Sequence, residues 1–128
     1  TAVLKTPYRD KENSPHYLLF IIPKENTDIT YLKTLFSDFN SNNYSSEIFE
    51  INSMMIGLEK HILLIKTFDN INKVSKYKNT IVSDQSIKKE LEKSEHITII
   101  ISQENYPEFY KNKDLEGYSK FFNNNYPQ

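Results

Sequence analysis

The stretch "HYLLFIIP" (residues 16–23) is short and almost continuously apolar. Such a run, stopped by Pro23 and the polar residues that follow, is typical of a central strand with protein on both faces. Two further runs, "HILLIKTF" (61–68) and "HITIII" (96–101), have the same character. If only one face of their sheet were covered, the other would present an apolar patch too large for a monomer. The sequence therefore predicts a sheet that is sheltered on both sides.

Between these runs the apolar period changes to that of a helix. Residues 28–40 and 69–82 each place apolar side chains at helical spacing. Each begins with residues that can cap the first backbone N–H groups of a helix (Thr27 or Asp28, and Asp69 or Asn70). Residues 83–93 are polar, with Ile87 and Leu91 one helical turn apart, which indicates a short helix or a loop.

Residues 46–52 alternate between polar and apolar and predict a half-buried edge strand. Residues 53–60 contain Gly57 and predict a hairpin connection. The resulting order, βαββαβ, is that of a ferredoxin-like α+β sandwich. In such a sheet we expect the first and third strands to be central and parallel, with the fourth beside the first and the second beside the third. Right-handed crossovers place both helices on one face, which leaves the other face bare.

The segment 102–126 is a candidate cover for that bare face. It holds seven of the seventeen aromatic residues of the chain. Its apolar residues recur at helical steps (Tyr106, Phe109, Tyr110, Leu115, Tyr118, Phe121, Phe122), with Asp114 as a candidate cap for the second of two short helices. Tyrosine suits such a layer, because its ring can be buried while its hydroxyl reaches water. We expect this C-terminal helical extension to pack on the sheet; the alternative is a surface offered to a partner.

Composition excludes several functional classes. The formal net charge is −1 and the isoelectric point about 6.3, so no global field attracts nucleic acid. Arg9 is the only arginine of the chain. Arginine is the residue that usually binds phosphate and guanine through two hydrogen bonds, so its scarcity argues against nucleic-acid binding. The absence of cysteine excludes disulfides, thiolate metal sites and a cysteine nucleophile. No apolar run approaches the length of about 20 residues that spans a bilayer.

The three histidines of the chain are candidate metal ligands. His16, His61 and His96 each begin a predicted strand. With the first and third strands parallel, His16 and His61 would share one end of the sheet, and His96 would lie at the other. A three-histidine site is then excluded, and a two-histidine site would have only Glu59 nearby in sequence. We expect ordinary strand-end histidines and no metal.

No other pattern indicates catalysis or a cofactor. The remaining carboxylates considered lie on an edge strand or in a charged connection (Glu47, Glu50, Glu90, Glu92, Glu95). With Gly57 and Gly117 as the only glycines, no glycine-rich phosphate cradle exists. "KYKN" (76–79) and "FYKNKD" (109–114) mix aromatics with lysine, but 61–68 lacks the central aromatics of RNA-recognition sheets. We therefore predict no catalytic, cofactor-binding or metal-binding residues.

Residues 1–15, "TAVLKTPYRDKENSP", carry two prolines and five charges without an apolar period. They are typical of a linker or extended arm. The rest, 16–128, is predicted to be one domain that includes the extension at 102–126. Because the chain begins at Thr1 without Met or an apolar leader, we expect a processed or excised part of a longer protein.

Several stretches together resemble a known family. "HYLLFIIP" (16–23), "SDFN" (37–40) and "ISQENYPEFYKNKDLEGYSKFF" (101–122) are similar, in order and spacing, to the C-terminal domain of large tetratricopeptide-repeat lipoproteins. These form the PorW/SprE family of the type IX secretion and gliding-motility machinery. The resemblance extends from about residue 14 to residue 126.

The resemblance implies a non-enzymatic scaffold in the periplasm. It implies anchoring to the outer membrane through an upstream lipid-modified N-terminus, so this part of the chain would not itself insert into the membrane. The expected partners are other protein subunits of the secretion machinery and helical repeats upstream in the same chain, not nucleic acid.

A second functional class stays open. Ferredoxin-like domains also serve as small-ligand-binding regulatory domains, which need a pocket with a few convergent polar groups. "SMMIGL" (53–58) is the best candidate wall, because methionine adapts to bound ligands.

Overall fold

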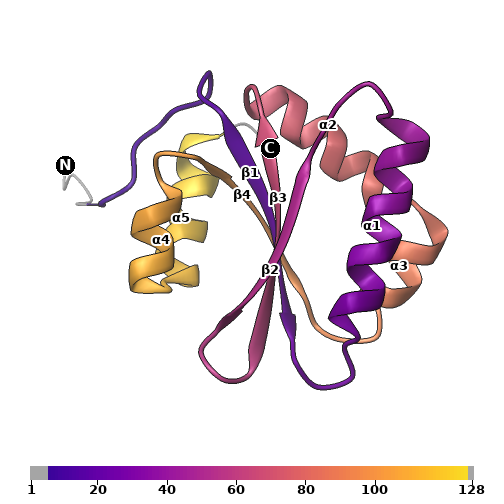
Figure 1. The fold of residues 1–128 in the computed structure, drawn as a ribbon. Helices are drawn as coiled ribbons and strands as arrows, with labels where there is room; N and C mark the ends of the chain where they lie inside the picture. The colour runs from indigo at the N-terminus through magenta and orange to yellow at the C-terminus, as the bar shows by residue number, and fades with distance from the viewer. Residues whose placement is uncertain (1–5, 127–128) are drawn as a thin grey trace.

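The apolar run that predicts a central strand forms β1 (His16–Pro23) in the computed structural model, which describes residues 6–126. It lies in a four-stranded antiparallel sheet with the order β2-β3-β1-β4 (Figure 1). The other strands are β2 (Glu50–Ile56), β3 (Lys60–Phe68) and β4 (Ile97–Ser102). The protein is α+β, and the predicted neighbours of each strand are confirmed.

The predicted direction of the central pair was wrong, because β1 and β3 are antiparallel. Their register pairs Leu19 with Leu64 and Ile21 with Ile62. The connectivity explains the difference. A tight turn joins β2 to β3, so these two strands must run in opposite directions. The crossover through the first helix returns the chain in the direction of β1, so β3, lying between β1 and β2, opposes both.

The first face of the sheet is covered by α1 (Ile29–Asn43), α2 (Ile71–Ile81) and α3 (Gln85–Leu91). The Asp28 carboxylate accepts a hydrogen bond from the backbone of α1, and the Asn70 side chain accepts one from that of α2. The buried side chains of this layer include every second residue of β1, and they come from β1, β3 and β4 and from all three helices (Leu18, Phe20, Ile22, Leu32, Phe36, Leu63, Ile65, Val74, Tyr77, Ile87, Leu91, Ile100). The ambiguous residues 83–93 therefore contain a helix that completes this layer.

The opposite face is covered by α4 (Tyr106–Asn112) and α5 (Leu115–Asn125) (Figure 1). Phe109, Tyr118 and Phe121 are buried there against the alternate residues of the strands (Leu19, Ile21, Ile62, Leu64, Ile99, Ile101). This confirms the prediction that the C-terminal extension packs on the sheet. Each fully buried aromatic or aliphatic side chain contributes roughly 1.5–3 kcal/mol, so this layer is part of the core.

The described part of the predicted arm, residues 6–15, forms no helix or strand but packs on the C-terminal layer. The side chain of Tyr8 is only 3% exposed, and its ring centroid lies 5.0 Å from that of Tyr118 and 5.6 Å from that of Phe121. Residues 1–5 of the predicted arm lie outside the described residues.

The hydroxyl of Tyr8 gives a prediction about stability, because it is buried without a hydrogen-bond partner among the described residues. Burial, with smaller contributions from Asp114 and Glu108, raises the pKa of Tyr8 to about 12, so the hydroxyl stays protonated. An unpaired buried hydroxyl costs roughly 1–3 kcal/mol. Tyr8→Phe is therefore expected to leave the free energy of unfolding unchanged or to raise it by about 1 kcal/mol.

Urea denaturation checks this expectation, with Tyr8→Ala as the comparison. Removing the whole ring is expected to lower the free energy of unfolding by roughly 3–5 kcal/mol, because it leaves a cavity. If Tyr8→Phe also lowers it by more than about 1 kcal/mol, the hydroxyl makes a stabilising bond and the expectation is wrong.

Candidate functional site

A pocket of about 410 Å³ lies at the end of the sheet where α1 ends and α2 begins. In Figure 1 this end of the sheet is at the top. We call this site the aromatic pocket. Its lining residues come from the connection between α1 and β2, from the end of β3 and from α2 (Tyr44, Glu47, Ile48, Phe49, Thr67, Phe68, Asp69, Lys73, Lys76, Tyr77). It combines an aromatic floor with a charged rim.

The floor is a continuous cluster of four rings. The centroid of Phe68 lies 4.7 Å from that of Phe49 and 4.9 Å from that of Tyr77. The ring of Tyr44 completes the cluster, 5.2 Å from Tyr77 and 5.8 Å from Phe49. Tyr77 is fully buried, whereas Tyr44 and Phe49 are half-buried and present part of their rings to the pocket. Such rings offer a flat, polarisable surface to an apolar or aromatic group.

The four rings come from segments that the sequence separates. Tyr44 is the C-cap of α1, Phe49 immediately precedes β2, Phe68 ends β3, and Tyr77 lies on the buried side of α2. Sequence reasoning placed Phe49 and Tyr77 on apolar faces but did not identify a pocket. No local signal indicates one, because only the sheet order and the crossovers bring these residues together.

The polar groups of the pocket are engaged or solvated rather than arranged for catalysis. The Lys73 Nζ lies 2.8 Å from Asp69 Oδ2, and this hydrogen bond and the carboxylate charge raise the pKa of Lys73. The Tyr77 hydroxyl donates to Asn40 Oδ1 at 2.6 Å, and burial raises its pKa, so it stays a fixed, protonated part of the wall. No nucleophile paired with a general base is found among the residues lining the pocket. The pocket therefore offers partly exposed rings and a charged rim to a bound group.

The histidines occupy different ends of the sheet from those predicted. Because β1 and β3 are antiparallel, His16 pairs with Phe68, whereas His61 pairs with Ile22 at the opposite end. His96 precedes Ile97, which pairs with Ile21, so it shares the end of His61 and not the reverse. The predicted grouping of His16 with His61 was wrong for the same reason as the predicted strand direction.

His16 and His96 form hydrogen bonds within the fold. His16 is buried, with Nδ1 2.7 Å from the Ser14 carbonyl and Nε2 3.3 Å from the Tyr126 hydroxyl. Burial lowers the pKa of His16, which favours the neutral ring. His96 Nδ1 lies 3.1 Å from the Leu91 carbonyl. Within residues 6–126, no group of three or more His, Asp or Glu side chains is placed to hold a metal ion.

The carboxylates considered from sequence are dispersed. Glu50 on β2 lies 3.8 Å from Lys66 Nζ, and Glu90 on α3 lies 2.8 Å from Lys93 Nζ. Glu47 alone among those considered lines the aromatic pocket. Glu50 and Glu90 pair with surface lysines rather than with one another, so they form no acid–base pair.

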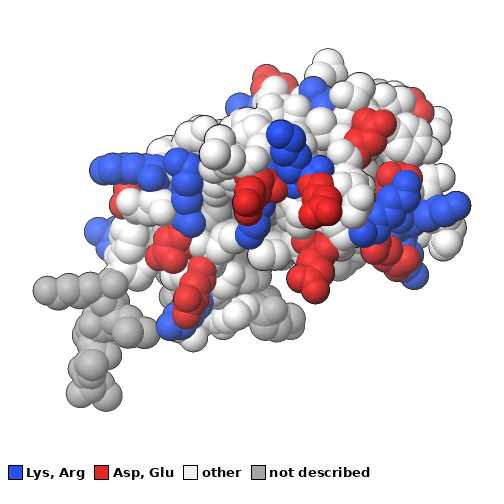
Figure 2. All heavy atoms as spheres, turned by 90° about the horizontal axis from the view of Figure 1, so that it is seen from below, with Lys and Arg blue, Asp and Glu red and all other residues white. Residues whose placement is uncertain are grey.

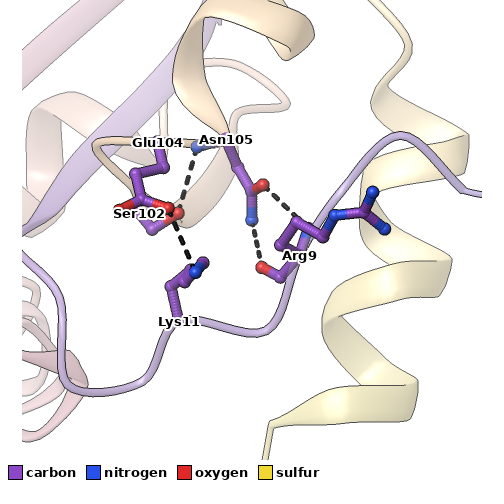
Figure 3. Close-up of polar contacts among 5 residues, drawn as sticks. All are labelled: Arg9, Lys11, Ser102, Glu104 and Asn105. Carbon is purple, nitrogen blue, oxygen red and sulfur yellow. Dashed lines mark hydrogen bonds and ion pairs between the residues drawn. The ribbon is translucent and has the colours of Figure 1, made fainter.

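A polar cluster joins the arm to the turn between β4 and α4 (Figure 3). The side chain of Asn105 accepts from the Arg9 backbone N–H at 2.9 Å and donates to the Arg9 carbonyl at 2.7 Å. The Asn105 backbone N–H donates to Ser102 Oγ at 3.1 Å, and Lys11 Nζ lies 3.5 Å from Glu104. The polar groups of the cluster pair with one another. The cluster therefore holds the arm against the turn rather than forming a ligand-binding site.

Neither the surface charge seen in Figure 2 nor the candidate ligand-binding wall at 53–58 indicates a second functional site. Figure 2 shows the end of the molecule opposite the aromatic pocket, where acidic and basic groups are interspersed rather than gathered by sign. The candidate wall at 53–58 forms the end of β2 and its turn, and Met54 Sδ lies 3.5 Å from the Tyr106 hydroxyl. Among residues 6–126, none of the helices has the length and apolar character that crossing a bilayer requires.

In comparisons with known proteins, no family model, curated protein or solved structure matches this chain.

Proposed function

We propose that this chain is a non-enzymatic protein-interaction domain that binds a partner through the aromatic pocket. The observation that carries the proposal is the pocket itself, in which Tyr44 and Phe49 expose part of their rings above the buried Tyr77. Partly exposed aromatic residues in a concave site are the usual anchors of protein interfaces. The charged rim suits a partner segment with an apolar or aromatic side chain and polar neighbours.

We propose that the fold that presents this pocket is a ferredoxin-like βαββαβ sandwich with an added C-terminal helical layer. Supporting this, β1 and β3 are the inner strands, and β1 and β2 run in the same direction with β3 between them. This is the arrangement of a split βαβ unit. The helices of the two crossovers, α1 and α2, pack on the same face.

We propose that the interaction takes place in the type IX secretion and gliding-motility machinery. The support is the resemblance of residues 16–23, 37–40 and 101–122 to the terminal domain of the PorW/SprE family. The domain would then act in the periplasm as a scaffold in a lipoprotein anchored to the outer membrane. Its partners would be other subunits of the machinery and the helical repeats upstream in its own chain, with neither nucleic acid nor direct membrane insertion involved.

Site-specific photo-crosslinking tests the proposed pocket. With p-benzoylphenylalanine in place of Tyr44 in the full-length protein in cells, we expect one discrete crosslinked product, because a bound partner would cover this ring. The matched control is the same replacement at Tyr31, which is 47% exposed on the same helix and does not line the pocket. Mass spectrometry then identifies the partner.

Two results would contradict the proposal. Equal crosslinking from both positions would show that the pocket has no preference over exposed surface. The absence of a product at position 44, in a chain whose thermal unfolding is unchanged, would show that the pocket is unoccupied. A partner outside the secretion machinery would overturn the proposed setting but not the interaction.

A further inference from the structure

The two edges of the sheet differ in whether a described helix covers them. At the β4 edge, the Tyr118 hydroxyl of α5 donates a hydrogen bond to the Ile100 carbonyl, and Phe122 packs against the cores of both faces. Helix α5 therefore runs beside β4 and covers that edge. At the other edge, β2 pairs with β3, and Figure 1 shows no described helix or loop in front of its free side.

The free edge of β2 lacks the features that usually prevent strand addition. Its sequence, "EINSMMI", contains no proline, glycine or lysine, and Glu50 at its first position is its only charge. Its pairing with β3 runs from Glu50 to Ile56 without a bulge or a shift of register. Regular, weakly charged edges of this kind are templates for pairing with another strand.

The most exposed apolar side chains of the described residues flank this same strand. Ile48 is 97% exposed just before β2, and Leu58 is 88% exposed in the turn just after it. Both are equally far along the chain from Ser53, the central residue of β2. If two copies of β2 pair antiparallel about Ser53, the Ile48 end of each strand meets the Leu58 end of the other copy. Both residues lie just outside the paired stretch, Leu58 in the turn that Gly57 begins. One symmetric contact would thus bring the two most exposed apolar side chains of each copy to the rim of the interface.

The same register also brings compatible side chains of the two β2 strands opposite each other. On the face of α1, Ile51 comes opposite Met55 of the other copy, so apolar side chains meet across the new pair. On the opposite face, Glu50 comes opposite Ile56, which itself neighbours Lys60 on β3. Glu50, the only charged residue of β2, would therefore lie near Lys60 on β3 of the other copy. At the centre, two copies of the exposed Ser53 face each other.

We propose that two copies of this chain associate through β2, paired antiparallel about Ser53, so that their sheets become continuous. This interaction goes beyond the proposed pocket function, because it uses the free edge of β2 and requires no other protein; the two surfaces adjoin at Ile48, which also lines the pocket.

Sedimentation of the purified chain alone tests this inference. We expect a reversible dimer over about a hundredfold range of protomer concentration, with the dimer fraction rising by mass action. Ser53→Lys is expected to weaken association at least about tenfold, because it places two like charges directly opposite each other. Ser53→Thr, which keeps the position neutral, is the matched control and is expected to associate like the wild type.

A cysteine variant tests the register. The chain has no native cysteine, so Ser53→Cys introduces a single thiol on the symmetry axis of the proposed pair. Directly opposite Cα atoms in an antiparallel pair lie about 4.5–5.5 Å apart, within the range that a disulfide spans, so we expect the disulfide to form under mild oxidation. Ser86→Cys, at an exposed serine of α3, is the control and is expected to remain largely reduced.

A wild-type chain that is monomeric at every concentration overturns the inference, as does a Ser53→Lys chain that still forms the dimer. Equal disulfide formation at positions 53 and 86 overturns the proposed register. Because these measurements contain no other protein, their failure leaves the pocket untouched, and failed crosslinking at Tyr44 leaves the pairing of β2 untouched.

Discussion

A chain that ends at Ser102 is expected to aggregate instead of folding to a monomer. The deletion removes α4 and α5, which cover one whole face of the sheet. It leaves a contiguous aliphatic surface on three strands exposed to water (Leu19, Ile21, Ile62, Leu64, Ile99, Ile101). It also removes the rings against which Tyr8 packs.

The size of the lost burial decides the expected outcome. Each of these aliphatic side chains contributes roughly 1.5–3 kcal/mol when fully buried. Several together amount to about the whole free energy of unfolding of an ordinary domain, roughly 5–15 kcal/mol. Exposed apolar surface of this extent also favours association with other copies. Size-exclusion chromatography and circular dichroism of the truncated and complete chains measure the effect.

A full-length variant with the same net charge as the truncated chain is the matched control. Residues 103–128 carry one more acidic than basic side chain, so the truncated chain has a formal net charge of zero. The full-length variant Glu116→Gln has the same net charge and keeps the helical layer; Glu116 is exposed, and its pair with Lys120 is long at 3.7 Å. We expect this variant to remain folded. A truncated chain that is monomeric, with native secondary structure, would show that the layer is dispensable.

The features that the sequence predicts well are those with a local physical cause. The bounds of β1 follow from a continuous apolar run that ends at Pro23. The caps Asp28, Asn70 and Asp114 accept hydrogen bonds from the first turns of α1, α2 and α5, because an acceptor side chain at that position satisfies an otherwise unpaired N–H. The need for cover on both faces follows from the apolar content of the strands, and the aromatic period of the C-terminal segment identifies the cover.

The features that it predicts poorly depend on distant segments. The edge strand β2 was predicted at 46–52 but lies at Glu50–Ile56, because the consecutive Met54 and Met55 break the alternation that indicates a strand. The direction of β1 relative to β3 depends on how the connections between the strands cross the sheet. No residue of either strand indicates that direction. The aromatic pocket likewise depends on bringing three separate segments to one end of the sheet.

Tyr118→Ala is expected to have the largest effect among single substitutions in the C-terminal layer. Its side chain is buried, and its ring centroid lies 5.0 Å from that of Tyr8 and 5.8 Å from that of Phe121. Its hydroxyl donates to the Ile100 carbonyl on β4, so one residue serves both the core and the sheet edge. Removing such a ring from a core lowers the free energy of unfolding by roughly 3–5 kcal/mol, as urea denaturation can measure.

Tyr118→Phe separates the two roles of this residue. It keeps the ring but leaves the Ile100 carbonyl without its hydroxyl donor, so we expect a loss of roughly 1–3 kcal/mol. Tyr110→Ala is the control, because Tyr110 is an exposed tyrosine of the same layer and its loss is expected to cost only about 0.5 kcal/mol. If Tyr118→Phe is as stable as the wild type, the hydroxyl does not support the edge. If Tyr118→Ala then costs no more than Tyr110→Ala, the ring is not part of the core, and α5 does not hold β4 from the side.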